Sequence, residues 1–513
     1  MNALPQVLDR YTQISELGGV VQRLIRRGTP LLVAAAVLVP AYFFFKNDSS
    51  WLALAAMGLS TVLALGIWQA KAVGLPLLPM MAAQHLAAYG IPLVSRNETL
   101  ERYSSAAITQ AGVEVGVFIV TLALAWRFGM ELFRPRQTQC YALSAFIKND
   151  DRTRRVGGIV LILIATGYQV LSSLQLIDFI LGLLPNGTYS IFTAIIKAIS
   201  MAGYFVVAMS LGSGKGKTGI RLLFWGTLIL NALIMASGFL LSSVTNLFAA
   251  VVLGLFWSSG RPPWRFLILA TLPLALLHLG KFEMRERYWS ERAQETFTPT
   301  LQNLPKYYGE WLDSSLRNLA GSGENQSGFG PEKKSTSSLL TRVDNLQNLL
   351  FVIEAIEGQS LPSLGGATYS LIPPLLIPRI LWPEKPRAHE GQVMLNVHFG
   401  RQGLADTFNT YIAWGLLPEA YGNFGTIWGG VILGLCLGLF FAWAEVFTAT
   451  KPLLSLEGLI TFALFMELTV SFEMVASVLV TALFQSGVII ALACIPFVYR
   501  ARVIRPESEA IEP

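Results

Sequence analysis

The sequence has 513 residues, of which 53% are hydrophobic and only 14% are charged, and its formal net charge is +6. Soluble globular proteins carry about 25% charged residues, so this composition excludes a cytosolic enzyme and indicates a membrane protein. In a membrane protein the positions of the basic residues indicate which loops face the cytoplasm. The positive net charge is therefore no sign of nucleic-acid binding, and we predict no nucleic-acid partner.

Apolar runs near the length that crosses a hydrocarbon core, about 20 residues for about 30 Å, recur along the chain. They predict an all-α polytopic membrane protein with about twelve transmembrane helices. The runs are 29–45, 51–70, 75–94, 104–126, 156–178, 188–211, 219–240, 245–259, 264–280, 425–447, 456–473 and 477–497.

The third run, 75–94, is interrupted by prolines and by His85, and hydropathy alone favours an interfacial or re-entrant segment. Charge favours a span instead. Lys71 precedes this run and the arginine-rich loop 127–155 follows the next one, so the positive-inside rule places both on the cytoplasmic side. Because only an even number of crossings joins them, 75–94 is predicted to span the membrane.

The same parity predicts both termini in the cytoplasm and one large extracytoplasmic loop containing amphipathic helices. The predicted parts are a basic cytoplasmic interfacial segment (1–28), a bundle of about nine spans (29–280), the outer loop with the active site (281–424), about three C-terminal spans (425–497) and a cytoplasmic tail (498–513). Within the loop, 341–357 places leucines and isoleucines on one helical face and charges elsewhere. This pattern predicts an amphipathic helix that either caps the spans or acts as a moving gate.

Two patterns that would carry other chemistry fail. The run 212–218 resembles a phosphate-binding loop but lacks the glycine required five residues before its Gly-Lys pair. The four histidines include no pair at the i, i+4 spacing of a zinc site. We therefore predict no metal and no cofactor.

A proline-rich turn in the outer loop holds the densest group of chemically active residues. Several cations on the outer face run against the positive-inside bias, so they favour an anionic ligand, and arginine offers planar bidentate donors for phosphate. A solvated loop that contacts lipid headgroups is the alternative interpretation. The residues are Arg379, Trp382, Lys385, Arg387, His389, Glu390 and Arg401.

A second element precedes the next span and contains Glu419, Tyr421 and Asn423 among small residues. Glu419 is either a helix-start carboxylate, stabilised by the dipole of the following span, or a general base aimed at a hydroxyl. The sequence leaves both interpretations open.

At these residues the chain resembles bacterial O-antigen and exopolysaccharide repeat-unit polymerases, the Wzy-type group. The shared features are about a dozen spans, cytoplasmic termini, a large late outer loop and two motifs. The motifs are read here at Pro378–Arg379 with Trp382–Pro386, and at Glu419–Gly425. The topological likeness covers nearly the whole chain, whereas the motifs cover about 50 residues.

The resemblance implies a metal-independent glycosyltransferase of the GT-C type in the bacterial cytoplasmic membrane, using undecaprenyl-diphosphate-linked oligosaccharides. It implies membrane lipids, a chain-length regulator and a flippase as partners. Arg379 and Arg387 would neutralise the departing diphosphate, assisted by Lys385 or Arg401. The base would be Glu419, His389 or Glu390, and the remaining substrate contacts would come from Trp382, Tyr421 and Asn423.

Two other functions stay open. A glycan ligase would move a finished chain to another acceptor with the same kind of site. A transporter of polysaccharide or lipid-linked glycan would also be helical and carry charges within its spans, such as Glu114, Lys197 and Glu467. For Glu114 and Lys197, mutual pairing and a substrate-facing role are equally open.

Overall fold

The structure is a computed structural model of the chain. It describes residues 14–95, 97–134, 143–147, 151–177, 188–214, 217–239, 241–259, 261–289, 301–320, 344–377, 381–382, 384–408, 412–449, 451, 456–468, 474–494 and 498–502.

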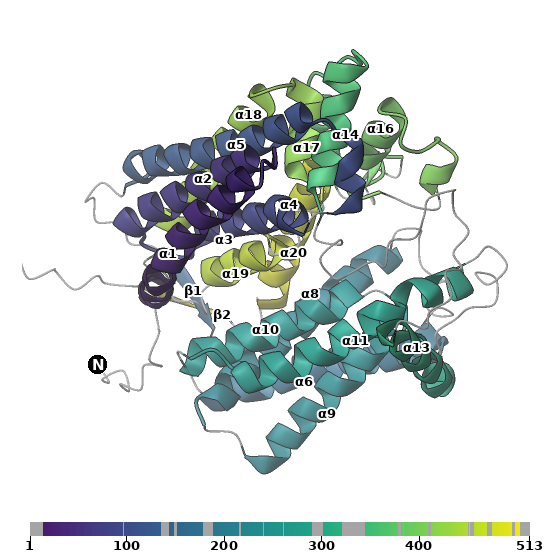
Figure 1. The fold of residues 1–513 in the computed structure, drawn as a ribbon. Coiled ribbons are helices and arrows are strands. Elements are labelled where there is room, and N and C mark those ends of the chain that lie inside the picture. Colours follow the sequence, from purple (N-terminus) through teal and green to yellow (C-terminus); the bar gives the residue numbers. More distant parts are fainter. Residues whose placement is uncertain are drawn as a thin grey trace, which may run out of the picture.

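Nearly all of the described residues are helical (Figure 1). The long helices are α1 (Ile14–Phe45), α2 (Trp51–Lys71), α5 (Ser105–Leu132), α6 (Asp151–Ser173), α8 (Thr188–Gly212), α9 (Thr218–Ala236), α10 (Leu241–Ser259), α11 (Trp264–Trp289), α13 (Leu304–Leu319), α18 (Trp428–Ala449), α19 (Leu456–Leu468) and α20 (Ala476–Cys494). The short helices are α3 (Leu77–His85), η1 (Leu86–Gly90), α4 (Ile91–Val94), η2 (Glu98–Arg102), η3 (Leu301–Asn303), α14 (Leu346–Ile353), η5 (Glu354–Gly358), η6 (Tyr369–Leu371), α15 (Ile372–Leu376), α16 (Glu390–His398), η7 (Asp406–Phe408) and α17 (Leu416–Phe424).

Nine helical segments in the described part of the chain are long and apolar enough to cross a membrane. They are α1, α2, the continuous α3–η1–α4, α5, α6, α8, α9, α11 and α18. This confirms the predicted all-helical, multi-pass architecture. The three remaining predicted runs coincide with α10, α19 and α20, whose apolar helical stretches are shorter.

The ambiguous run 75–94 forms one of the nine segments, Leu77–Val94, with a π-helical turn in its middle. The Lys71 ammonium at the end of α2 contacts the Glu131 carboxylate near the end of α5. The chain therefore returns to the same end of the bundle after α3–η1–α4 and α5, as the charge argument predicts for two crossings.

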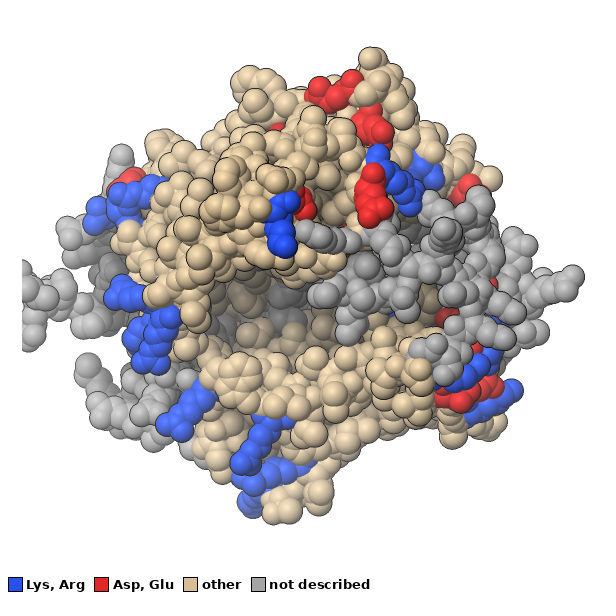
Figure 2. Space-filling model, viewed as in Figure 1, with Lys and Arg blue, Asp and Glu red and all other residues tan. Residues whose placement is uncertain are grey.

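Several basic segments meet at this end, which we call the basic end. A two-stranded antiparallel sheet joins β1 (Leu143–Ile147) to β2 (Val498–Arg502), with Ala145 opposite Arg500. The Ile14 N–H, at the start of α1, donates to the Lys451 carbonyl at 3.1 Å. Figure 2 shows Lys and Arg gathered along the left side of the molecule, toward these segments. The loops predicted to share the cytoplasmic face thus lie together.

Glycines let the central helices approach closely. A Cβ on Gly112 of α5 would lie 2.3 Å from the Ala53 Cα of α2, and a Cβ on Gly438 of α18 would lie 2.4 Å from the Leu122 carbonyl oxygen of α5. Both distances are below any normal contact, so only glycine fits. These contacts fix α5 between α2 and α18 at the centre of the main core.

The helices form two groups (Figure 1). One contains α1 to α5 with α17 and α18, and the other contains α6 to α13, with α19 and α20 between them. Contacts of α20 with α8 and of α10 with α19 join the groups. Figure 2 shows a hollow between the two groups.

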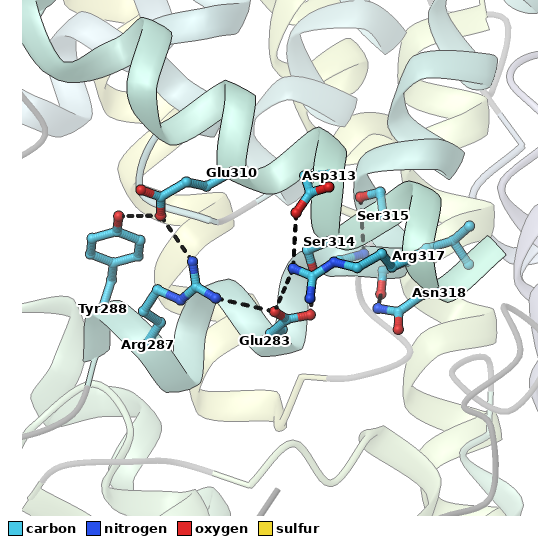
Figure 3. Close-up of polar contacts among 11 residues, drawn as sticks. Glu283, Arg287, Tyr288, Glu310, Asp313, Ser314, Ser315, Arg317 and Asn318 are labelled. Atoms are coloured by element: carbon cyan, nitrogen blue, oxygen red, sulfur yellow. Dashed lines mark hydrogen bonds and ion pairs between the residues drawn. The ribbon is translucent and has the colours of Figure 1, made fainter. Parts of the chain in front are cut away.

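The amphipathic helix α13 lies on the end of α11, and its charges are largely paired there (Figure 3). Arg287 donates to Glu310 at 3.1 Å, and Arg317 donates to Glu283 at 3.3 Å. The Gly280 N–H donates to the buried Ser315 hydroxyl at 3.1 Å. This cluster docks α13, and both arginines already have carboxylate partners.

Candidate functional site

The residues singled out in the outer loop gather where α14, α16 and α17 meet the first turns of α5 and α20. In Figure 1 this region lies at the opposite end of the upper helix group from β1 and β2, and we call it the α17 end. The loop segments reach it because Gly415 and Gly425, at φ values of +95° and +76°, let the chain turn sharply on either side of α17.

Glu419 is fully buried and connects three segments of this end. Its Oε1 accepts from the Thr368 hydroxyl at 2.7 Å, and its Oε2 accepts from the Ala476 N–H at 2.5 Å. Asn423 donates to the Thr368 oxygen at 2.9 Å. Burial raises the pKa of Glu419 to about 7. Glu419 thus lies in the first turn of α17, and its carboxylate accepts the first N–H of α20; it does not cap the following span α18.

Arg401 lies between two aromatic rings. Its guanidinium carbon is 5.4 Å from the Phe351 ring centroid and 5.5 Å from the Trp414 ring centroid. Nη1 donates to the Asn348 side-chain oxygen at 2.6 Å, and Asn348 is held by the Trp414 carbonyl at 2.9 Å. The rings and the amide therefore fix the plane of the guanidinium.

No carboxylate lies within ion-pair distance of Arg401 among the described residues. Burial lowers the pKa of Arg401, and the neighbouring Tyr103 opposes this effect. Arginine nevertheless keeps its charge in proteins. Arg401 is therefore a half-buried cation, and its guanidinium has more N–H donors than the one that binds Asn348. Chemically, this is a preformed site for an anion that accepts hydrogen bonds.

Two cations of the proline-rich turn, Lys385 and Arg387, bind partners within the turn itself. The Lys385 ammonium donates to the Leu375 carbonyl at 2.9 Å and to the Ile377 carbonyl at 2.6 Å. Arg387 pairs with Glu390 at 2.9 Å. These bonds brace the turn, and the Glu390 carboxylate already neutralises much of the charge of Arg387.

The other predicted residues of the turn differ in their surroundings. His389 Nδ1 lies 2.8 Å from the Gln392 side-chain oxygen, and Trp382 is 40% exposed. Arg379 lies outside the described residues. The structure therefore brings Arg401, Glu419 and Asn423 into one packed region and leaves Trp382 at its edge.

Sequence reasoning missed a carboxylate at this end, Glu357. Its Oε1 accepts from the Tyr421 hydroxyl at 2.9 Å, from the Gln110 amide at 3.2 Å and from the Thr426 hydroxyl. The amphipathic pattern over 341–357 assigned Glu357 only to a polar face. The structure instead ends the α-helix at Ile353 and continues as the π-helical turn η5, which carries Glu357.

Two further carboxylates are buried within the spans and serve as anchors. Glu114 on α5 accepts the N–H groups of Ile427 and Gly430, at 2.9 and 2.7 Å, and so caps the start of α18. Glu445 on α18 accepts two indole N–H groups and the backbone N–H groups of Val73 and Gly74. One expectation was that Glu114 pairs with Lys197. Glu114 instead binds backbone N–H groups, and Lys197 is exposed on α8.

Among the described residues, no three His, Cys, Asp or Glu side chains gather closely enough to hold a metal ion. Comparisons with protein-family models, characterised proteins and solved structures returned no match to this chain.

Proposed function

We propose that this protein is an integral membrane glycosyltransferase that joins undecaprenyl-diphosphate-linked oligosaccharide repeat units at the outer face of the bacterial cytoplasmic membrane. The observation that carries the proposal is Arg401, a half-buried cation fixed by Phe351, Trp414 and Asn348 with no carboxylate partner among the described residues. Such a guanidinium can bind the diphosphate of a lipid-linked substrate at the end of the transmembrane helices.

The chemistry requires stabilisation of a leaving group that gains negative charge. When the bond between a sugar and a lipid diphosphate breaks, an oriented guanidinium can strengthen its hydrogen bonds to the departing oxygens. Arg401 is oriented before the substrate arrives, so little reorganisation is needed during the reaction. Arg401 is partly buried, and the lower dielectric constant there strengthens its interaction with an anion.

The assignment as a polymerase is supported by the likeness to repeat-unit polymerases. One of the two resembling motifs, Glu419–Gly425, spans most of α17, whose Glu419 and Asn423 hold the loop segments in place. We assign these two residues to positioning. Arg387 and Arg379 are proposed as secondary contacts, with Arg387 exchanging Glu390 for a phosphate oxygen.

Arg401→Ala tests the proposal against the matched control Arg317→Ala, which removes an arginine of α13 that is already paired. The measurement is gel analysis of lipid-linked and surface glycans from deletion cells that express each variant at equal levels in the membrane. We expect single lipid-linked repeats and no long glycan with Arg401→Ala, a loss of about 100-fold or more, and normal ladders with the control.

Normal ladders with Arg401→Ala would contradict the proposed role of this residue. The deletion strain itself separates polymerase from ligase. A polymerase deletion leaves single repeat units on the lipid, whereas intact polymer that stays on its lipid diphosphate would assign the chain to ligation.

A further inference from the structure

A pocket of about 550 Å³ opens at the α17 end, between the first turns of α2 and α5 and the turn that joins α17 to α18. Its lining includes Trp51, Thr109, Gln110 and Thr426. The pocket is separate from the Arg401 guanidinium, which is not part of its lining.

The lining suits an uncharged ligand with both apolar and hydroxyl-bearing parts. Among the described residues no lysine or arginine lines the pocket, so it offers no cationic partner for a phosphate. Glu114 is part of the lining, but both of its carboxylate oxygens already accept backbone N–H groups. Most of the lining is apolar, including Leu52, Val113 and Ile427, while the Trp51 indole, several hydroxyls and the Gln110 amide can contact a sugar ring and its hydroxyls.

Glu357 lies beside this pocket, because Gln110 and Thr426 belong to the lining and both donate to its carboxylate. Glu357 is exposed, and its second oxygen, Oε2, has no hydrogen bond among the described contacts. Hydrogen bonds, foremost from Thr426, hold the pKa of Glu357 below its usual range. The group is therefore ionised at neutral pH and able to accept a proton.

Glu357 and Arg401 are connected through one short helical stretch, α14 with η5. Phe351, which contacts Arg401, precedes Glu357 by six residues, so helical rise separates these two backbone positions by about 9 Å along the axis. The carboxylate and the guanidinium are therefore both at the α17 end.

We propose that this pocket binds the acceptor glycan and that Glu357 accepts the proton of the attacking hydroxyl. This inference rests on the proposed function. The hydroxyl oxygen forms a bond to the anomeric carbon of the donor sugar, and the bond from that carbon to the diphosphate breaks. Its electron pair leaves with the lipid diphosphate, and the hydroxyl proton moves to Glu357 Oε2.

A weakly basic carboxylate is sufficient for this step. The hydroxyl becomes strongly acidic as its oxygen bonds to the anomeric carbon, so the proton is transferred late. Two of the three bases expected from the sequence, Glu419 and Glu390, have carboxylate oxygens that are already engaged. Glu419 is fully buried, with both oxygens accepting hydrogen bonds, and Glu390 is paired with Arg387.

The test uses purified full-length protein in nanodiscs of phosphatidylethanolamine and phosphatidylglycerol. Glu357→Gln keeps the shape of the side chain and removes the base. Ala106→Phe fills the pocket from an exposed position in its lining. Glu354→Gln, an exposed carboxylate at the start of the same turn, is the matched control.

Three quantities are measured: binding of undecaprenyl diphosphate, the kcat and KM of glycan transfer, and binding of octyl glucoside below its critical micelle concentration. We expect Glu357→Gln to lower kcat about 100-fold or more with unchanged diphosphate binding. Ala106→Phe should raise the KM for the acceptor and abolish glucoside binding. Glu354→Gln should match the native protein in all three.

Each contrary result has a distinct meaning. Native kcat in Glu357→Gln beside an inactive Arg401→Ala overturns the inference and leaves the proposed function standing. Loss of diphosphate binding in Glu357→Gln overturns the assignment as a base. If the native protein neither binds undecaprenyl diphosphate nor transfers glycan, the proposed function and the proton step fail together. Glucoside binding then decides separately whether the pocket takes a sugar.

Discussion

Replacement of Glu419 by glutamine should remove one component of the pH dependence of stability, the one between pH 4.5 and about 7. Glu419 is fully buried, and its pKa rises from 4.5 to about 7 in the folded protein. The folded state therefore retains a proton that the unfolded state releases between these two values. As far as Glu419 is concerned, the folded protein is most stable below pH 4.5, loses stability as the pH rises, and reaches a constant level above about pH 7.

The size of the effect follows from the same two values. One pKa unit corresponds to about 1.4 kcal/mol, so the rise from 4.5 to about 7 makes the folded protein about 3 kcal/mol less stable in neutral than in acidic solution. In Glu419→Gln, the amide oxygen can accept from the Ala476 N–H while the amide nitrogen donates to Thr368. The neutral side chain keeps the contacts and removes the titration.

Thermal unfolding of nanodisc-embedded protein, followed between pH 4.5 and 8, measures this difference. Infrared difference spectra report protonated carboxyl groups, and the part of their band that belongs to Glu419 should be missing in Glu419→Gln. Glu384→Gln, an exposed carboxylate of the proline-rich turn, is the control and should retain the native pH dependence. An unchanged pH slope in Glu419→Gln, with no part of the infrared band missing, would refute the reasoning.

Two further predictions concern packing within the spans. Glu445→Ala should destabilise the protein by about 2–5 kcal/mol in thermal unfolding, because four N–H donors, three of them buried and one partly buried, lose their acceptor; a native unfolding temperature would disprove the anchoring role. Gly112→Ala should cost about 1–3 kcal/mol by overlap with Ala53, whereas Gly66→Ala, which meets open space, should be neutral or stabilising; equal effects of the two would contradict the close approach of α2 and α5.

The architecture could be read from the sequence because it depends on local properties. Span length follows from the apolar run, and lysine and arginine report which ends lie together. This reasoning identified 75–94 as a crossing against its hydropathy, and the contact of Lys71 with Glu131 joins the expected ends. The strand pairing of β1 with β2 had no local signal, since neither segment is distinctive alone.

The candidate site was identified only in part. The cations of the outer loop are similar in sequence, yet Arg387 finds a carboxylate three residues away while Arg401 finds none among the described residues. Glu419 stood out by position, but its partners, Thr368 and Ala476, lie more than 50 residues from it. Sequence pattern alone could not show which charges are already satisfied.

The sequence by itself determined that the chain is a multi-pass helical membrane protein, because hydropathy and charge act through each segment separately. Only the tertiary structure decided which groups face one another. Arg401 is held by Asn348, 53 residues away, and Glu357 by Thr426, 69 residues away. Such contacts arise from packing between elements, and no local preference of the chain encodes them.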